Sequence, residues 1–196
     1  MADVTDASRR PSRVAVALLH YPVYDRSRAV VTSSLTSVDL HDIARTARCY
    51  AVEPFYVVTP VAAQREMARR IAAHWLDEQE APHPRAEALA RVRVCESLDA
   101  ALGDLAGACG ATPFWAVTGA SLDQDLTSFQ DLRAAIHEPR HPAVLLVFGT
   151  GWGLSRDLTR AAPCRLEPIR GLDGFNHLPV RAAVAIVLDR LLGLRI

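Results

Sequence analysis

The segment from Val144 to Ser155 constrains the fold of this chain more than any other. It begins with an uninterrupted apolar run, which is typical of a strand buried on both faces of a parallel sheet. Gly149, Gly151 and Gly153 follow, and Ser155 then stands where it can cap a helix. Ligands of open α/β sheets bind beyond the carboxyl ends of strands, and glycines let backbone N–H groups approach a ligand closely. We therefore expect a ligand on this turn, and a tight turn without a ligand is the alternative.

Two well-known glycine motifs do not fit the turn. The dinucleotide-binding fingerprint requires glycine where Leu154 stands, and it normally opens a domain, whereas little chain remains here. A P-loop requires a lysine after its glycines, and all 22 basic residues of this chain are arginine. The lack of lysine also excludes Schiff-base chemistry and pyridoxal phosphate.

Composition indicates one globular domain. The chain has 196 residues, half of them hydrophobic, and no composition break that would divide it. We assign residues 13–196 to a single domain and the polar segment 1–12 to a mobile tail. The formal net charge is zero, so the global charge gives no reason of its own to expect nucleic acid.

Cysteine and histidine spacing gives no sign of a metal site. The four cysteines form no Cys-x-x-Cys pair, which indicates a reduced cytoplasmic protein. His137 and His141 flank Pro139, so they cannot share a helix face as metal ligands would. The apolar run Val14–Leu19 is too short for a signal peptide, and we expect no metal and no membrane segment.

Strand and helix patterns alternate along the chain. Buried strands are predicted at Val14–Leu19, Phe55–Val58, Val92–Val94, Phe114–Val117, Val144–Phe148 and Arg165–Leu166. Helices are predicted at Asp39–Tyr50, Val61–Glu78, Ser97–Leu105, Ser128–Ile136 and Val180–Leu192, with a short one after Ser155. In the second of them Met67, Ile71 and Trp75 lie along one apolar stripe. The pattern predicts an α/β protein with a parallel sheet of about six strands and helices on both faces.

Polar turns that contain glycine follow the last three predicted strands. All of them fall at carboxyl ends, so we expect them to form one site. Tyr21, Tyr24 and Asp25 follow the first strand and are further candidates for substrate contact, with aromatic packing over the sheet edge as the alternative.

Three segments together resemble the motifs of the SPOUT superfamily of RNA methyltransferases. The first is Asp39–Arg45, the second Leu146–Ser155, and the third comprises Leu166–Gly171 and Phe175–Ile186. A narrower resemblance is carried by Leu18–Tyr24 together with the segment from Asn176. These two segments resemble the bacterial branch of predicted S-adenosylmethionine-dependent RNA methyltransferases. The resemblance spans about Val14 to Leu192.

The resemblance implies a deep trefoil knot in the C-terminal part of the chain. It also implies that S-adenosylmethionine lies against backbone groups of three loops, Thr118–Ser121, Gly149–Leu154 and Ile169–Val180. The predicted cofactor contacts are Thr118, Gly119, Ala120, Phe148, Gly149, Thr150, Gly151, Gly153, Leu154, Ile169, Gly171, Asn176, His177, Leu178 and Val180.

The resemblance also implies methyl transfer from S-adenosylmethionine to structured RNA, either tRNA or rRNA, by a cytoplasmic homodimer. Arg45 stands at the position of the functional arginine of the first motif, and Asp173 is the candidate base. An ion pair of Arg45 with Asp39 or Asp42, and an Asx turn of Asp173 before Gly174, are the structural alternatives.

The chain departs from the broader SPOUT pattern in each motif. Asp39 and His41 replace Asn and Gly in the first, the second lacks its usual Glu and is one residue shorter, and Pro179 replaces Asn in the third. Two alternatives therefore remain. One is a regulatory module that binds S-adenosylmethionine or a nucleotide without catalysis, and the other is an unknotted flavodoxin-like binding domain.

Overall fold

One parallel sheet forms the centre of the protein. The structure is a computed structural model that describes residues 12–76, 83–137 and 141–194. The strands lie in the order β5-β4-β1-β8-β6-β9-β7, and each pairs in parallel with its neighbours. Their bounds are β1 Arg13–Leu19, β4 Phe55–Val58, β5 Val92–Cys95, β6 Phe114–Val117, β7 Leu126–Thr127, β8 Ala143–Gly149 and β9 Cys164–Leu166. A separate antiparallel hairpin consists of β2 Val23–Tyr24 and β3 Val30–Val31.

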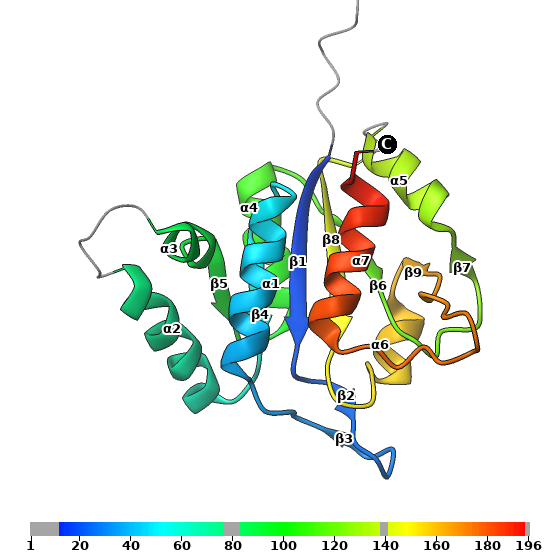
Figure 1. Ribbon diagram of the computed structural model, residues 1–196, viewed down its shortest axis with the longest axis horizontal. Helices are drawn as coiled ribbons and strands as arrows, with labels where there is room; N and C mark the ends of the chain where they lie inside the picture. The colour runs from blue at the N-terminus through cyan, green and yellow to red at the C-terminus, as the bar shows by residue number, and fades with distance from the viewer. Residues whose placement is uncertain (1–11, 77–82, 138–140, 195–196) are drawn as a thin grey trace, which may run out of the picture.

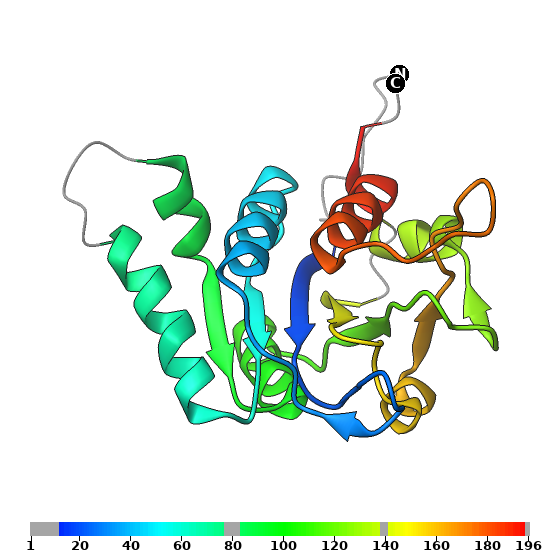
Figure 2. The same cartoon turned by 60° about the horizontal axis from the view of Figure 1, so that its bottom comes forward.

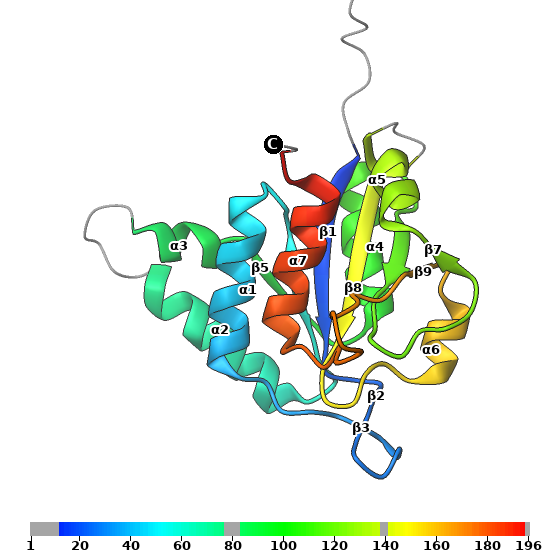
Figure 3. The same ribbon diagram turned by 45° about the vertical axis from the view of Figure 1, so that its right-hand side comes forward.

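Helices cover both faces of this sheet (Figures 1 and 3). The helices are α1 Ser37–Cys49, α2 Ala62–Leu76, α3 Pro84–Leu89, α4 Leu98–Cys109, α5 Phe129–His137, α6 Arg156–Ala161 and α7 Val180–Leu192. Buried side chains of α1, α2, α3, α5 and α7 share one core with alternate residues of β1 and β8, and α4 and α6 pack into the core on the opposite face.

The central strands show why their sequences are apolar throughout. Val14, Val16 and Leu18 of β1 point into the first core, whereas Ala15 and Leu19 point into the second. A strand that is buried on both faces needs apolar side chains at every position, because neither face meets water. The α/β architecture with a parallel sheet and helices on both faces is therefore confirmed.

The elements missed by the sequence patterns are short. β2, β3 and β7 have two residues each, so they carry no period by which a pattern could find them. The extra strand β7 explains why the sheet has seven strands instead of the predicted six. Helix α3, which has only six residues and His83 as its N-cap, was also not predicted.

Two smaller predictions are wrong. We expected Met67 to lie on the buried stripe of α2, but it is exposed and its neighbour Ala68 is the buried residue. We assigned Ser12 to the tail, but it is buried and its hydroxyl donates to the His141 carbonyl at 2.6 Å. The rest of the predicted tail, and the predicted end of α2 at 77–78, lie outside the described residues.

The loops that leave the carboxyl ends of the strands gather at one edge of the sheet. Figure 2 brings this edge forward, with the β2–β3 hairpin beside the turn after β8 and the segment before α7 above them. The candidate site lies there.

Candidate functional site

A pocket of about 600 Å³ opens at the carboxyl edge of the sheet. This volume is within the range of small-molecule sites. Every predicted cofactor contact except Gly171 lines it, so the three predicted loops do meet at one site. Gly171 instead packs against its own loop. A Cβ atom there would collide with the Phe175 carbonyl oxygen, so the close approach requires glycine.

Different physical constraints require glycine at the three glycine positions of the turn after β8. A Cβ atom at Gly149 would lie 2.7 Å from Cγ of Leu154, and one at Gly151 would lie 2.9 Å from the Tyr24 carbonyl oxygen. Gly151 and Gly153 have φ angles of 59° and 96°, which side chains rarely adopt. Only the Cβ position of Gly153 is open space, so our attribution of all three glycines to a ligand is too simple.

The β2–β3 hairpin holds this turn in place. The Trp152 N–H donates to the Tyr24 carbonyl at 2.9 Å, and the Tyr24 N–H donates to the Gly153 carbonyl at 2.9 Å. The Tyr24 hydroxyl also accepts from the Arg156 N–H at 3.0 Å. Tyr21, Tyr24 and Asp25, which we considered as substrate contacts, do not line the pocket. Tyr24 contributes to the site indirectly, because it holds the backbone of the glycine turn.

A buried histidine joins the turn to the segment before α1. His20 Nδ1 lies 3.0 Å from Ser33 Oγ, Ser33 Oγ is hydrogen-bonded to Thr150 Oγ1, and Thr150 Oγ1 donates to the Leu19 carbonyl at 3.1 Å. With the Thr150 proton on the Leu19 carbonyl, we assign Ser33 as the donor to Thr150 and the His20 Nδ1–H as the donor to Ser33. His20 Nε2 is then an unprotonated nitrogen, and it has no partner among the described residues.

This arrangement keeps His20 neutral. Its side chain is fully buried, and burial lowers its pKa from 6.5 to about 4, although the Asp39 carboxylate opposes the shift. Protonation would place a charged N–H at Nε2, where no acceptor is available among the described residues.

A polar wall of the pocket was not predicted as part of the site. Ser33, Ser34, Thr36, Asp39, Arg28 and Arg181 contribute to it. Thr36 Oγ1 donates to Asp39 Oδ2 at 2.6 Å, and Arg181 lies 3.3 Å from Asp39 Oδ1 and 3.6 Å from Asp42 Oδ2. The hydroxyl-rich run 32–37 was a visible signal for this wall, whereas the two arginines carry no pattern.

The two predicted catalytic residues lie outside the pocket of their own chain. Arg45 is exposed on α1, in a shallow groove against α7 that Asp42, Cys49 and Arg181 also line. Asp39 and Asp42 pair with Arg181, and no ion pair or hydrogen bond holds Arg45 among the described residues. Its neighbour Arg48 is paired with Glu87.

Asp173 has the structural role that we considered as its alternative. Its Oδ1 accepts from the Phe175 N–H at 3.1 Å, which forms an Asx turn in an exposed loop. Asp173 does not line the pocket.

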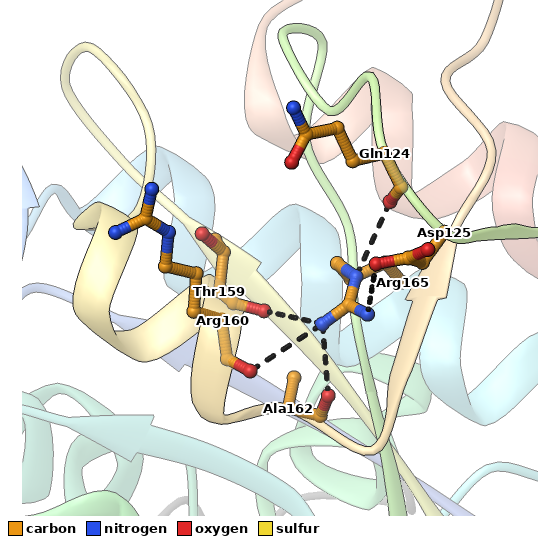
Figure 4. Close-up of polar contacts among 6 residues, drawn as sticks. All are labelled: Gln124, Asp125, Thr159, Arg160, Ala162 and Arg165. Atoms are coloured by element: carbon orange, nitrogen blue, oxygen red, sulfur yellow. Dashed lines mark hydrogen bonds and ion pairs between the residues drawn. The ribbon is translucent and has the colours of Figure 1, made fainter.

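Long-range contacts fix the loops that surround the pocket. The Asn176 side chain donates to the Ala120 carbonyl at 2.9 Å and so joins the third loop to the first. Arg165 on β9 donates to the carbonyl groups of Thr159, Arg160 and Ala162 at the end of α6, to the Gln124 carbonyl, and to Asp125 Oδ2 (Figure 4). One guanidinium thus holds the end of α6 against the loop between β6 and β7.

The described residues show neither a metal centre nor a membrane helix. Within the described ranges, no group of three or more His, Cys, Asp or Glu side chains is placed to share a metal ion. None of the helices there has the length and apolarity that a membrane crossing requires.

The buried His20 predicts a loss of stability in mild acid. Because its pKa is about 4 in the folded protein and 6.5 in the unfolded chain, the unfolded state binds protons more tightly as the pH falls below 6.5. Between pH 7 and 5 the free energy of unfolding should fall by roughly 2 kcal/mol more in the parent than in His20→Asn, which keeps a donor for Ser33. Urea unfolding at both pH values measures the difference, and equal losses would contradict the assignment.

Comparison with known proteins identifies the family. Residues 13–193 match the family model described as SAM-dependent RNA methyltransferase. The chain is 41% identical over 180 residues to an uncharacterized protein of Aquifex aeolicus, covering 91% of this chain and 87% of that one. It is also 41% identical over 187 residues to a tRNA (guanine-N(1)-)-methyltransferase of Nitratidesulfovibrio vulgaris, covering 94% of this chain but 43% of that protein. The chain therefore spans less than half the length of this second relative.

Solved structures agree on the fold. A methylase family protein from Neisseria gonorrhoeae superposes with a TM-score of 0.61 at 18% identity, covering 92% of this chain and 82% of that one. The TrmH/SpoU tRNA modifying enzyme of A. aeolicus superposes with a TM-score of 0.53 at 14% identity, covering 92% and 76%. The family match identifies an enzyme and so favours methyl transfer over the non-catalytic module. The chain belongs to the SAM-dependent RNA methyltransferase family and has the SPOUT fold.

Proposed function

We propose that the pocket at the carboxyl edge binds S-adenosylmethionine and that the protein transfers its methyl group to a nucleotide of tRNA. The observation that carries the proposal is the meeting of three loops, far apart in sequence, around one pocket. The tRNA substrate is proposed from the relative that is named as a tRNA methyltransferase. Because this chain spans less than half of that relative, its guanine-N1 specificity is not carried over.

The residues of the pocket fit an adenosyl ligand. Gly119, Gly149, Gly151 and Gly153 line the pocket without side chains of their own, while Leu154, Ile169 and Leu178 supply apolar surface. Backbone groups can bond the adenine edge and the amino-acid part, and apolar side chains can cover the adenine faces. The bound donor supplies an activated methyl group.

The protein itself has to orient the acceptor and assist the loss of its proton. We propose that Arg45 holds or orients the acceptor through its guanidinium, which can grip a phosphate by two parallel hydrogen bonds. Arg45 lies outside the pocket of its own chain, so this role requires a second subunit. Asp173 is a weaker candidate for the base, since it lies in an Asx turn away from the pocket.

We propose a homodimer in which α1 and α7 form the contact. Val184, Val187, Leu188 and Leu191 of α7 are buried inside the protomer, so the apolar content of α7 gives little support for a dimer. The stronger support is Arg45, which is exposed beside α7 without an ion pair among the described residues, so its guanidinium is available to an anion or a partner that approaches this face.

We further propose that the C-terminal segment forms the trefoil knot implied by the SPOUT resemblance. The strand order supports it, because β9 lies two positions beyond β8 and three beyond β1, and the chain then returns so that α7 packs on the central strands. The cytoplasm is the proposed location. The free cysteines fit its reducing conditions, and its RNA provides the substrate.

The first prediction concerns donor binding. Gly153→Val should weaken binding of S-adenosylmethionine at least tenfold, because valine strongly disfavours a φ of 96° and would distort the turn. Gly107→Ala is the matched control, since Gly107 lies in α4 with open space around its Cβ position. Calorimetric titration measures both variants, and circular dichroism checks that they are folded. Equal affinity of Gly153→Val and the parent would place the donor elsewhere.

The second prediction concerns the reaction. The parent should transfer tritium from labelled S-adenosylmethionine to unmodified tRNA, and unlabelled S-adenosylhomocysteine should compete. Donor binding with no transfer to tRNA, but with transfer to unmodified rRNA, would refute the tRNA substrate while keeping the enzyme. Binding with no transfer to either RNA would refute the proposed reaction.

The third prediction tests the shared site. Arg45→Ala and Gly153→Val should each be inactive as homodimers, but mixed subunits that exchange should regain activity. Half of the sites in a heterodimer then contain both intact parts. Light scattering should show a dimer at micromolar concentration. A monomer, or no recovery despite proven exchange, would contradict the role of Arg45 in the partner's site.

A further inference from the structure

Two aromatic rings lie near each other in the lining of the pocket. The ring centroids of Trp152 and His177 lie 6.3 Å apart, and their planes are inclined by 38°. Both residues line the pocket, yet the Trp152 side chain is 50% exposed. A large indole usually lies covered in a core, so an uncovered indole beside a ligand pocket indicates a contact surface.

The indole projects from a turn that is held in place. Both hydrogen bonds to Tyr24 fasten the backbone of Trp152 and Gly153, as described above. On the other side, His177 follows Asn176, whose side chain is bonded to the Ala120 carbonyl. Rings on anchored backbone lose little freedom when a ligand binds, which favours binding.

The spacing of the rings suits a nucleobase. Stacked bases are separated by about 3.4 Å, so a base between two rings needs roughly 7 Å between their centres. The observed centroid distance of 6.3 Å is shorter and the planes are inclined by 38°, so the His177 ring has to turn and move outward before a base can enter. His177 is exposed, which leaves its side chain room to move.

A cation also lines the pocket. Arg28 lines the pocket from the tip of the β2–β3 hairpin, and its guanidinium lies 5.9 Å from the centre of the Tyr24 ring. Asp25 holds this tip, because its Oδ1 accepts from the Ala29 N–H at 2.9 Å and from the Ser27 hydroxyl at 2.7 Å. No carboxylate pairs with Arg28 in the part of the chain that the structure describes, so its charge is available to a phosphate.

We propose that Trp152 and His177 stack on the two faces of the acceptor base while Arg28 binds a phosphate of the same strand. This inference rests on the proposed function and adds the class of acceptor. A base with both faces free must be unpaired or flipped out, so the substrate is a nucleotide in a loop or bulge of the RNA and not one inside a duplex. Donor and acceptor would share this pocket, the donor against the backbone groups of its loops and the acceptor base between the rings of Trp152 and His177.

Steady-state kinetics with tRNA separate this role from donor binding. Trp152→Ala should raise KM for tRNA by about tenfold or more, as expected for a lost stacking contact, and Trp152→Phe should restore most of the loss. The affinity for S-adenosylmethionine should change less than about twofold in both variants. Phe175→Ala is the matched control, because Phe175 is 67% exposed on the same loop as His177 but does not line the pocket. An unchanged KM for Trp152→Ala, or an equal loss of donor affinity, would overturn the proposal.

Tryptophan fluorescence gives a readout that needs no catalysis. A single-stranded RNA oligonucleotide should quench the emission of the parent, saturated with S-adenosylhomocysteine, and the quenching should be largely lost in Trp152→Phe. Quenching without methyl transfer by the parent would refute the proposed reaction and keep the stacking site. Transfer that is insensitive to Trp152→Ala would refute the stacking site and keep the reaction. A changed oligomeric state of Trp152→Ala would assign the ring to a subunit contact and overturn the proposal.

Salt dependence tests the arginine. Arg28→Ala should reduce the slope of log affinity against log salt concentration by about one for the same oligonucleotide. Arg26→Ala is the control, since Arg26 is exposed on the same hairpin but does not line the pocket. Equal slopes in the two variants would show that Arg28 contacts no phosphate.

Discussion

The site depends on the parallel direction of the central strands. In β1 and β8 the partners run in register from Arg13 and Ala143 to Leu19 and Gly149, so both strands end at the same level. The next residues, His20 and Thr150, therefore lie side by side although 130 positions separate them in the sequence, and Ser33 can bridge their side chains. Because each strand of the sheet runs in the same direction, the loops after β6, β8 and β9 leave from one edge and can enclose one pocket.

Contacts between distant segments give these loops a defined shape. Tyr24 holds the glycine turn, Asn176 holds the third loop to the first, and Arg165 holds the end of α6 to the loop after β6. Each of these contacts links two segments that are separate in the sequence. A pocket preorganised in this way binds its ligand with a smaller ordering cost than loops without such contacts.

The strongest sequence patterns were those set by burial. The run Val144–Phe148 and the helix Val180–Leu192 could be predicted because a segment that is buried on both sides is apolar almost throughout. Its length then separates a strand from a helix. The position of the ligand pocket was predictable from the same strands, because carboxyl ends in a parallel sheet share an edge. The resemblance to SPOUT proteins then supplied the loops, and all but Gly171 of the predicted contacts line the pocket.

Features made by contact between distant residues were not predictable. The two-residue strands have no period, and Arg28 and Arg181 reach the pocket only because of how the hairpin and α7 are placed. The exposure of Arg45 also follows from tertiary structure, since its acidic neighbours prefer Arg181. Sequence alone could not choose between Arg45 and Arg181 as the partner of these carboxylates. Arg45 lies on the same helix as Asp39 and Asp42, whereas the position of Arg181 depends on how α7 packs against α1.

The central claim is that the loops at the carboxyl edge form the methyl-donor site of an RNA methyltransferase. A crystal structure of the protein with S-adenosylhomocysteine tests it most directly. The account predicts one ligand per chain between the loops, against the backbone of Gly149–Leu154 and within reach of Thr118 and Leu178. A ligand bound on any other surface, or a pocket that stays empty at saturating ligand, would contradict it.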